Sequence, residues 1–348
     1  MDLDLVHRFD ALRAQRRLDV TGAAVELKVP EARLFAAHIG PDRVRLNNDW
    51  STLLEGLIDL GPLVFHTDGR LGIHRIEAKL DRVRTSASSA ILQGDTAELR
   101  LLLSRWHSAW AVMHDDDGFA EIGVHIHDRH GDPVLRIVQG MRTDRRALQR
   151  LVAKLRMPRQ DAPVPLITPP SLPSTPAVQP DLRRALQASW PHLSGSRDLS
   201  ALLRRHGLRR PDAYALVAPL YAQPVSIDFL GRLVDEVVRS ELMVAVSLGN
   251  RACIQTHRGI LDLASRPGRW LTVGDPALFI HFDTSIIESA WVVRRPGRGG
   301  THMLVELLGA GGDLLGGIRS TRSEDQQECR RWRRVVGSTL EKGAFEKS

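Results

Sequence analysis

The sequence predicts an α+β protein that consists of two copies of one domain. Each copy is expected to have N-terminal helices, an antiparallel β-sheet meander and a closing C-terminal helix. The first observation behind this prediction is a set of four short motifs that recur at a spacing of 181 residues. Pro30-Glu31-Ala32 returns as Pro211-Asp212-Ala213, and Ser108-Ala109-Trp110 returns as Ser289-Ala290-Trp291. Four matches in one register indicate a tandem repeat.

The second observation is a proline-rich stretch between the two halves. Residues 158–180 contain eight prolines. A chain with so many prolines cannot pack as a helix or a central strand, so it is expected to be an extended linker. The predicted organisation is therefore a first repeat at 1–157, the linker at 158–180 and a second repeat at 181–342.

The third observation is the order of patterns within each half. Leu5, Phe9 and Leu12 have helical spacing, residues 23–27 predict a second helix, and residues 199–205 open the second half in the same way. Short apolar runs separated by turn signals follow and predict antiparallel strands. The expected strands are 63–65, 71–73, 99–103, 109–113, 122–126 and 134–138, then 243–246, 252–254, 278–282, 290–293, 303–308 and 314–318. Basic amphipathic helices at 145–155 and 325–340 close the two halves, which defines the α+β class.

Composition narrows the function classes. No stretch of about 18 apolar residues is present, so no membrane insertion is expected, and the acidic N-terminus lacks an apolar signal core; we expect a cytoplasmic protein. The net charge of +7 favours an anionic partner, and only 5 of the 48 basic residues are Lys. Arg binds carboxylates through two parallel hydrogen bonds. The cysteines, Cys253 and Cys329, form neither a disulfide framework nor a metal-finger pattern.

Three segments of the second half resemble one bacterial family. Residues 243–257 (MVAVSLGNRACIQTH), 270–276 (WLTVGDP) and 288–296 (ESAWVVRRP) are similar to motifs of haem-utilisation proteins of the HemS/ChuS/HmuS type, which are hemin-degrading or hemin-transport factors. Weaker likeness at 98–102 and 122–137 extends the resemblance over nearly the whole chain except the linker. The resemblance implies a cytoplasmic protein of two similar halves that binds one haem, and that either degrades it or passes it to an oxygenase.

The resemblance also implies an axial histidine on the helix after the linker, but this chain departs from the pattern there. With Trp190 and residues 202–203 in register, the ligand position holds Arg197. A guanidinium has no lone pair for a metal, so the departure weakens a haem-degrading activity, and whether the chain is an enzyme stays open. His192, His206 and His257 are weak replacement candidates; the alternative is that each is a surface or hydrogen-bonded histidine.

Four further residues match haem-contacting positions of the family. Arg100 corresponds to an arginine on the distal side of the haem, and Leu102 replaces a family aromatic residue. Arg210 and Arg294 are candidates to pair with propionates. The alternative interpretation is that these arginines are solvated surface charges.

Two clusters could suggest a metal site. His125, His127 and His130 include two histidines on one face of a strand, but a half-exposed strand explains them better. Residues 115–118 (DDDG) indicate a hairpin loop rather than a calcium loop, because no matching downstream Glu follows. No phosphate-binding loop or dinucleotide fingerprint is present.

The leading functional hypothesis is a cytoplasmic haem carrier in haem iron uptake. Its expected partners are haem and a haem transporter, an oxygenase or a reductase. The alternatives are a haem-degrading enzyme that uses an external electron donor, a diverged scaffold without haem, and a nucleic-acid-binding protein that uses its helix-turn-helix-like segments and basic surface. The nucleic-acid alternative ranks low because such helix pairs are common without DNA contact.

Overall fold

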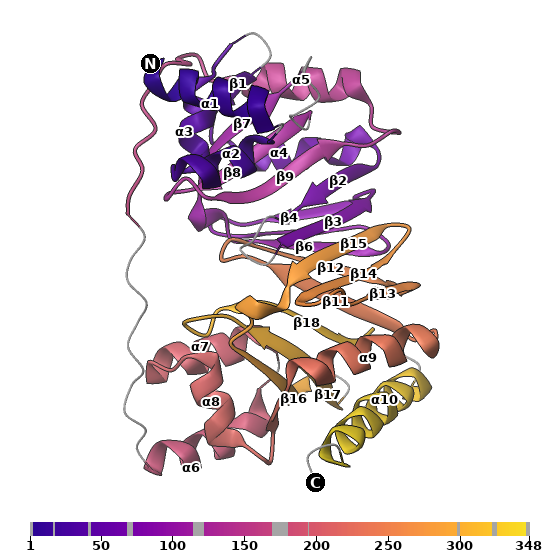
Figure 1. The fold of residues 1–348 in the computed structure, drawn as a ribbon. Coiled ribbons are helices and arrows are strands. Elements are labelled where there is room, and N and C mark those ends of the chain that lie inside the picture. Colours follow the sequence, from indigo (N-terminus) through magenta and orange to yellow (C-terminus); the bar gives the residue numbers. More distant parts are fainter. Residues whose placement is uncertain are drawn as a thin grey trace. The chain divides into compact units, whose positions relative to one another are not determined.

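The computed structural model describes residues 3–16, 18–40, 43–67, 72–113, 122–168, 180–193, 195–297, 300–321 and 326–345. The chain divides into two compact units (Figure 1). The first comprises Met1–Gly69, Ile73–Pro170 and Asn250–Gln255, and the second comprises Arg70–Gly72, Ser171–Gly249 and Thr256–Ser348. Helices and antiparallel strands are present in both units, which confirms the α+β class.

The first unit opens with a layer of three helices. They are α1 (Leu3–Arg16), α2 (Val20–Leu27) and α3 (Glu31–Ala37). Asp19 caps α2 by accepting a hydrogen bond from the backbone of Gly22, 2.7 Å away. Phe9, Phe35 and Trp110 are buried together between these helices and the sheet, so an apolar core holds the layer in place.

The first unit's main sheet has the strand order β1-β7-β8-β9-β2-β3, and β4, β5 and β6 pair consecutively. The strands are β1 (Arg43–Leu46), β2 (Leu63–His66), β3 (Gly72–Ala78), β4 (Arg82–Thr85), β5 (Ala90–Gln93), β6 (Ala97–Leu101), β7 (Trp106–Val112), β8 (Gly123–Asp128) and β9 (Pro133–Gln139). A meander is therefore present only from β7 to β9 and from β4 to β6, because β1 and β2 join the sheet out of chain order. Two helices complete the unit, α4 (Trp50–Gly56) and α5 (Arg145–Leu155).

The second unit repeats this arrangement. Its helical layer contains α6 (Pro180–Ser189), the one-turn 3-10 helix η3 (Trp190–His192), α7 (Ser196–His206) and α8 (Arg210–Val217). Its main sheet has the order β10-β16-β17-β18-β11-β12, and β13, β14 and β15 pair consecutively. The strands are β10 (Ala222–Val225), β11 (Met243–Gly249), β12 (Cys253–Ile260), β13 (Leu263–Ser265), β14 (Trp270–Asp275), β15 (Leu278–Asp283), β16 (Ser289–Gly297), β17 (Gly300–Leu308) and β18 (Leu314–Ser320). The remaining helices, α9 (Ile227–Arg239) and α10 (Gln326–Phe345), lie side by side (Figure 1).

Strand register shows that the repeat is exact across the central strands. Trp110 pairs with His125 across β7 and β8, and Trp291 pairs with Glu306 across β16 and β17. Both partners are again 181 residues apart. The prediction that Trp110 and Trp291 occupy equivalent positions is confirmed, since each lies on the strand next to the edge strand of its sheet.

Part of the expected linker lies against the first unit. Residues 162–168 have no helix or strand, as predicted. The backbone of Ile167 nevertheless donates a hydrogen bond to Arg129, Gln160 bonds to the backbone of Arg45, and Leu166 packs against the core of the helical layer. These contacts order at least this part of the proline-rich segment. None of the described helices is long and apolar enough to cross a membrane.

Candidate functional site

The one-turn helix that ends at His192 is fixed to the second unit's sheet. The indole Nε1 of Trp190 donates a hydrogen bond of 2.9 Å to the backbone carbonyl of Arg294 on β16. The amide of Arg294 in turn donates to the carbonyl of Tyr221, at 2.7 Å. Trp190 is fully buried whereas His192 is exposed. The structure thus brings the predicted residues His192 and Arg294 onto neighbouring segments.

Aromatic packing makes this region rigid. The ring of Trp190 stacks with that of Tyr221 at 6.2 Å and meets Tyr214 edge to face at 6.0 Å. Tyr214 also contacts Trp291, with ring centroids 5.8 Å apart. Such ring pairs add about 0.5–1.5 kcal/mol beyond their area burial. The backbone that carries His192 and Arg294 is therefore held from below by a continuous aromatic core.

Helix α7 carries Arg197 in its first turn and His206 as its last residue. Leu199 and Leu203 bury one side of the helix, and Gly207 ends it in the left-handed conformation with φ of 62°. The side chain of Arg197 lies outside the described residues. Nine residues of helix separate Arg197 from His206, about 14 Å along the axis, so the structure does not bring His206 to the position of Arg197.

Arg210 is part of a buried polar network rather than an exposed cation. Its Nη1 donates to the Tyr214 hydroxyl and to Glu306 Oε2, each at 3.1 Å. Arg295 donates to the other oxygen of Glu306 at 3.3 Å, and the Tyr214 hydroxyl also donates to this carboxylate. Burial acts to raise the pKa of the Glu306 carboxyl, but the charges of Arg210 and Arg295 outweigh it and lower that pKa. The interpretation of Arg210 as a solvated surface charge is therefore wrong.

Arg294 differs from Arg210 because its side chain is exposed and only its backbone is used in the fold. In the first unit, Arg100 on β6 is 53% exposed at its side chain, and its Nε donates to Glu98 Oε1 at 2.7 Å. Leu102 follows β6 and is 44% exposed. Arg294, Arg100 and Leu102 thus all keep the accessibility that a ligand contact requires.

His257 is not accessible to a bound group. The ring is buried, and its Nε2 lies 2.5 Å from Asp275 Oδ2. Asp275 also accepts backbone hydrogen bonds from Ala277 and Leu278. Burial acts to raise the Asp275 pKa, but the bonds to His257 and to these amides lower it, so the carboxylate is committed to the fold. This contradicts the expectation of His257 as a replacement ligand.

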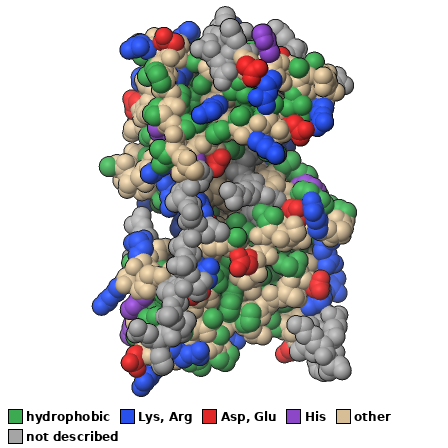
Figure 2. Space-filling view, turned by 60° about the vertical axis from the view of Figure 1, so that its left-hand side comes forward, with side chains coloured by type: hydrophobic (Ala, Val, Ile, Leu, Met, Phe, Trp, Pro, Cys, Tyr) green, Lys and Arg blue, Asp and Glu red, His purple; other side chains and the backbone are tan. Residues whose placement is uncertain are grey.

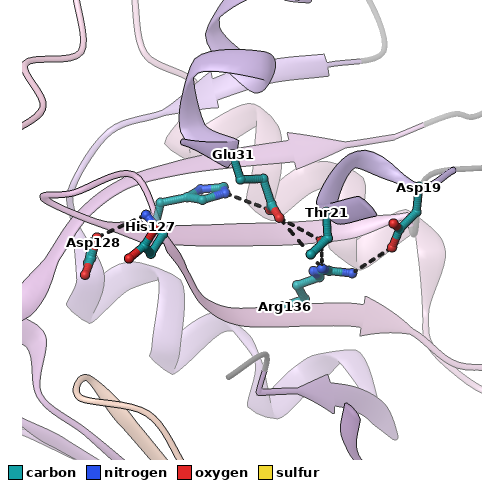
Figure 3. A network of polar contacts seen from close by, with 7 residues as sticks. Asp19, Thr21, Glu31, His127, Asp128 and Arg136 are labelled. Atoms are coloured by element: carbon teal, nitrogen blue, oxygen red, sulfur yellow. Dashed lines mark hydrogen bonds and ion pairs between the residues drawn. The ribbon is translucent and has the colours of Figure 1, made fainter. Parts of the chain in front are cut away.

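The histidines of the first unit take part in a structural network that Figure 3 shows. His127 Nε2 lies 2.9 Å from Glu31 Oε1, and both side chains are buried. The Thr21 hydroxyl donates to Glu31 Oε2 at 2.7 Å, and Arg136 Nη2 lies 3.8 Å from the same oxygen. His130 Nδ1 instead bonds to the carbonyl of Ile167 at 2.8 Å. The network joins α2 and α3 to β8 and β9.

These contacts decide between the two interpretations of the histidine cluster. Within the described residues, no group of three or more His, Cys, Asp or Glu side chains could hold a metal ion. The metal alternative for His125, His127 and His130 is therefore wrong for the described chain, although a half-exposed strand is also inaccurate because β8 is buried from residue 123 to 127. The acidic loop at 115–118 lies outside the described residues.

Sequence analysis did not identify Glu31, Arg136, Tyr214 or Glu306 as network residues. The one available signal was the repeat register, since His125 and Glu306 each face the tryptophan shared by the two halves. A polar residue inside an otherwise apolar strand, opposite a buried Trp, predicts a partner on the covering helix.

Comparison with known proteins places the fold in a family. The model of the haemin-degrading HemS.ChuX domain matches residues 28–155 and again 207–338. The chain therefore belongs to this family and contains the domain twice. The hemin transport protein HmuS of Yersinia pestis is 24% identical over 92% of each chain. The hemin transport protein HemS of Yersinia enterocolitica is 24% identical over 89% of each chain.

Two solved structures share the whole fold. Apo-PhuS, a heme-binding protein from Pseudomonas aeruginosa, is 29% identical with a TM-score of 0.88, and the match covers 96% of this chain and 98% of that chain. ChuS, described as an E. coli heme oxygenase, is 23% identical with a TM-score of 0.84 and covers 97% of this chain and 99% of its own. The match to ChuS supports the fold alone.

Proposed function

We propose that this protein binds hemin and carries it in the cytoplasm during haem iron uptake. The observation that carries the proposal is the match to heme-binding PhuS, which extends over 96% of the chain at 29% identity. Both copies of the family domain are present, and the exposed Arg294 and Arg100 offer cations to the carboxylates of an anionic ligand. A haem transporter upstream and an oxygenase or reductase downstream are the partners that a carrier would need.

Within this proposal, His192 is the iron ligand. An axial nitrogen must be accessible and must not already be used in the fold. The rings of His38, His127, His130, His257 and His281 each form a hydrogen bond in the structure. In the second unit, His192 is an exposed ring on a rigid turn near Arg294, whereas His206 is at the far end of α7.

The anionic edge of hemin would contact Arg294, with Arg100 as a second cation and Leu102 as apolar surface. Arg210 contributes less directly, because its guanidinium already compensates Glu306. Arg197 cannot donate to iron, so it is proposed as a neighbouring cation. Arg294→Ala should weaken hemin binding by about 1–3 kcal/mol if it forms a charge-assisted bond. Arg183→Ala, an exposed arginine on α6, is the matched control and should have no effect.

Haem degradation is the second candidate, and the haemin-degrading description of the matching family favours it. Ring opening needs electrons from a partner protein or a reductant. A reductant and air, added to the hemin complex, should leave the Soret band stable for a carrier and bleach it for an enzyme. Nucleic-acid binding has no such support: on the face in Figure 2, Lys and Arg side chains are scattered among acidic and hydrophobic ones rather than gathered in one basic surface.

A hemin titration followed at the Soret band tests the proposal. Wild type should bind hemin with a nitrogen-ligated spectrum, His192→Ala should lose that spectrum, and the control His206→Ala should keep it. Arg197→His should add a nitrogen donor and strengthen binding. A wild-type ligand spectrum that survives His192→Ala would reject His192 as the ligand. If neither wild type nor Arg197→His binds hemin, the carrier function fails and the chain is a diverged scaffold.

A further inference from the structure

His281 on β15 is held in place by three neighbours in the second unit. Its Nδ1 lies 2.9 Å from the Thr272 hydroxyl, directly across the β14–β15 pair. On one side its ring stacks with that of Trp270, at 4.7 Å between centroids and 4° between planes. Phe279 lies parallel within 15° at 6.4 Å. The imidazole therefore has a fixed plane and one anchored nitrogen.

The anchored nitrogen determines what the other nitrogen can do. When Nδ1–H donates to the Thr272 oxygen, Nε2 carries a lone pair, and no hydrogen bond to Nε2 is present among the described residues. Metal-binding histidines are held in this way, with one ring nitrogen bonded to the protein and the other directed at the metal. His281 thus has the tautomer and the rigidity of a metal ligand.

The surface around His281 is flat and largely apolar. Leu263 and Phe279 are 41% and 40% exposed, and the pairing register places Gly274 between them. The guanidinium of Arg269 lies 5.7 Å from the Trp270 ring and is held by Asp283 at 3.1 Å. This face of β13–β15 therefore presents ring edges and aliphatic carbon, with a cation beside it.

We propose that this face is a second hemin site, in which His281 Nε2 binds the iron. The inference rests on the proposed function, that the chain handles hemin. A macrocycle lies perpendicular to its axial ligand, so it would lie flat across the edges of Trp270 and Phe279, with a propionate near Arg269. A metal-free planar ligand fits less well. It would need an open ring face to stack on, and Trp270 already covers one face of His281.

The first repeat does not offer the same site. Thr272 pairs with His281 as Ile91 pairs with Arg100, each 181 residues apart, so the position of His281 holds an arginine in the first repeat. Arginine has no lone pair to donate to iron. The second site is therefore specific to the second unit.

Stoichiometric hemin titration of the full chain tests this site. Wild type should bind two equivalents, the second more weakly than the first. His281→Phe keeps a ring to stack on Trp270 but removes the nitrogen, so it should bind one equivalent with unchanged affinity. Thr272→Val removes only the partner of Nδ1 and should weaken the second equivalent by about tenfold while sparing the first, which is the effect reported for loss of such supporting bonds.

The outcomes separate this inference from the proposed function. If wild type binds a single equivalent, or if His281→Phe still binds two, the second site is refuted while the carrier function stands. If wild type binds no hemin, both fail. His206→Phe is the matched control, since it replaces a half-buried histidine of the same unit and should leave both equivalents in place.

Discussion

Glu31→Gln tests the energetics of the buried network in the first unit. Burial acts to raise the pKa of the Glu31 carboxyl, but His127, Arg136 and Thr21 outweigh it and lower the pKa to about 2 from an ordinary value of 4.5. A difference of that size corresponds to about 3 kcal/mol of stabilisation by the ionised form. Glu31→Gln should therefore destabilise the first unit at pH 7 by about 3 kcal/mol, since it leaves Arg136 buried without its carboxylate.

The sign of the pH dependence follows from the lowered pKa. Above about pH 4.5 the carboxyl is ionised in both the folded and the unfolded chain, and the stabilisation is complete. As the pH falls from about 4.5 to about 2, the unfolded chain takes up a proton that the folded chain does not, so stability is lost over this range. Glu31→Gln should remove this part of the pH dependence.

Hydrogen exchange of peptides from α2, α3 and β8 measures the effect locally, without assuming that the two units unfold together. Glu26→Gln is the matched control: Glu26 is also ion-paired, to Arg16 at 2.6 Å, but both side chains are about half exposed. Exposed pairs contribute about 0.2–1 kcal/mol. If the two variants cost the same, or if Glu31→Gln keeps the acid dependence of wild type, Glu31 is not an ionised member of the network.

Further substitutions address other parts of the fold. Tyr214→Phe should destabilise the second unit by about 1–3 kcal/mol in urea unfolding, because it leaves the buried Glu306 carboxylate without one donor; a shift no larger than that of Tyr221→Phe would contradict this. Cys253→Ser should not change the number of thiols that react with a disulfide reagent in the folded protein, since burial raises the pKa of the Cys253 thiol to about 12; a lost equivalent would show that the thiol is accessible. Asp144→Ala should cost about 1 kcal/mol, because Asp144 caps α5 by accepting from the Ala147 amide at 3.0 Å; an unchanged unfolding midpoint would rule out the cap.

The elements that sequence analysis predicted well are those with a strong local pattern. Helix α5 has the predicted bounds, 145–155, because Asp144 caps it and Leu148, Leu151 and Leu155 define one buried face. Helix α9 was missed although its pattern is as clear, with Ser226 as cap and Phe229, Leu230 and Leu233 buried. The omission was one of attention to motifs, since the physical signal was present.

The polar networks could not be predicted because they depend on contacts distant in sequence. Glu31 and His127 are 96 positions apart, as are Arg210 and Glu306. Sequence periodicity describes which face of a strand is buried, but it does not identify the helix residue above it. The same limit explains the expectation for His257, whose partner Asp275 lies on another strand. The repeat register was the only source of long-range information.

The two networks are opposite in charge, and this has a consequence for folding. In the first unit the carboxylates, Asp19 and Glu31, come from the helical layer, and His127 and Arg136 come from the sheet. In the second unit the helix supplies Arg210 and the sheet supplies Glu306. A helical layer that docked on the sheet of the other repeat would bury Arg210 against Arg136, and like charges in a buried interface cost several kcal/mol.

The charge reversal therefore disfavours mispairing between two halves whose sheets share one topology. Glu31→Arg measures the cost, because it places a guanidinium against Arg136 in the correctly folded chain. It should destabilise the first unit clearly more than Glu31→Gln, since it adds repulsion to the loss of the ion pair. Equal costs for the two variants would mean that the interface tolerates like charges, and the networks would then not discriminate between the repeats.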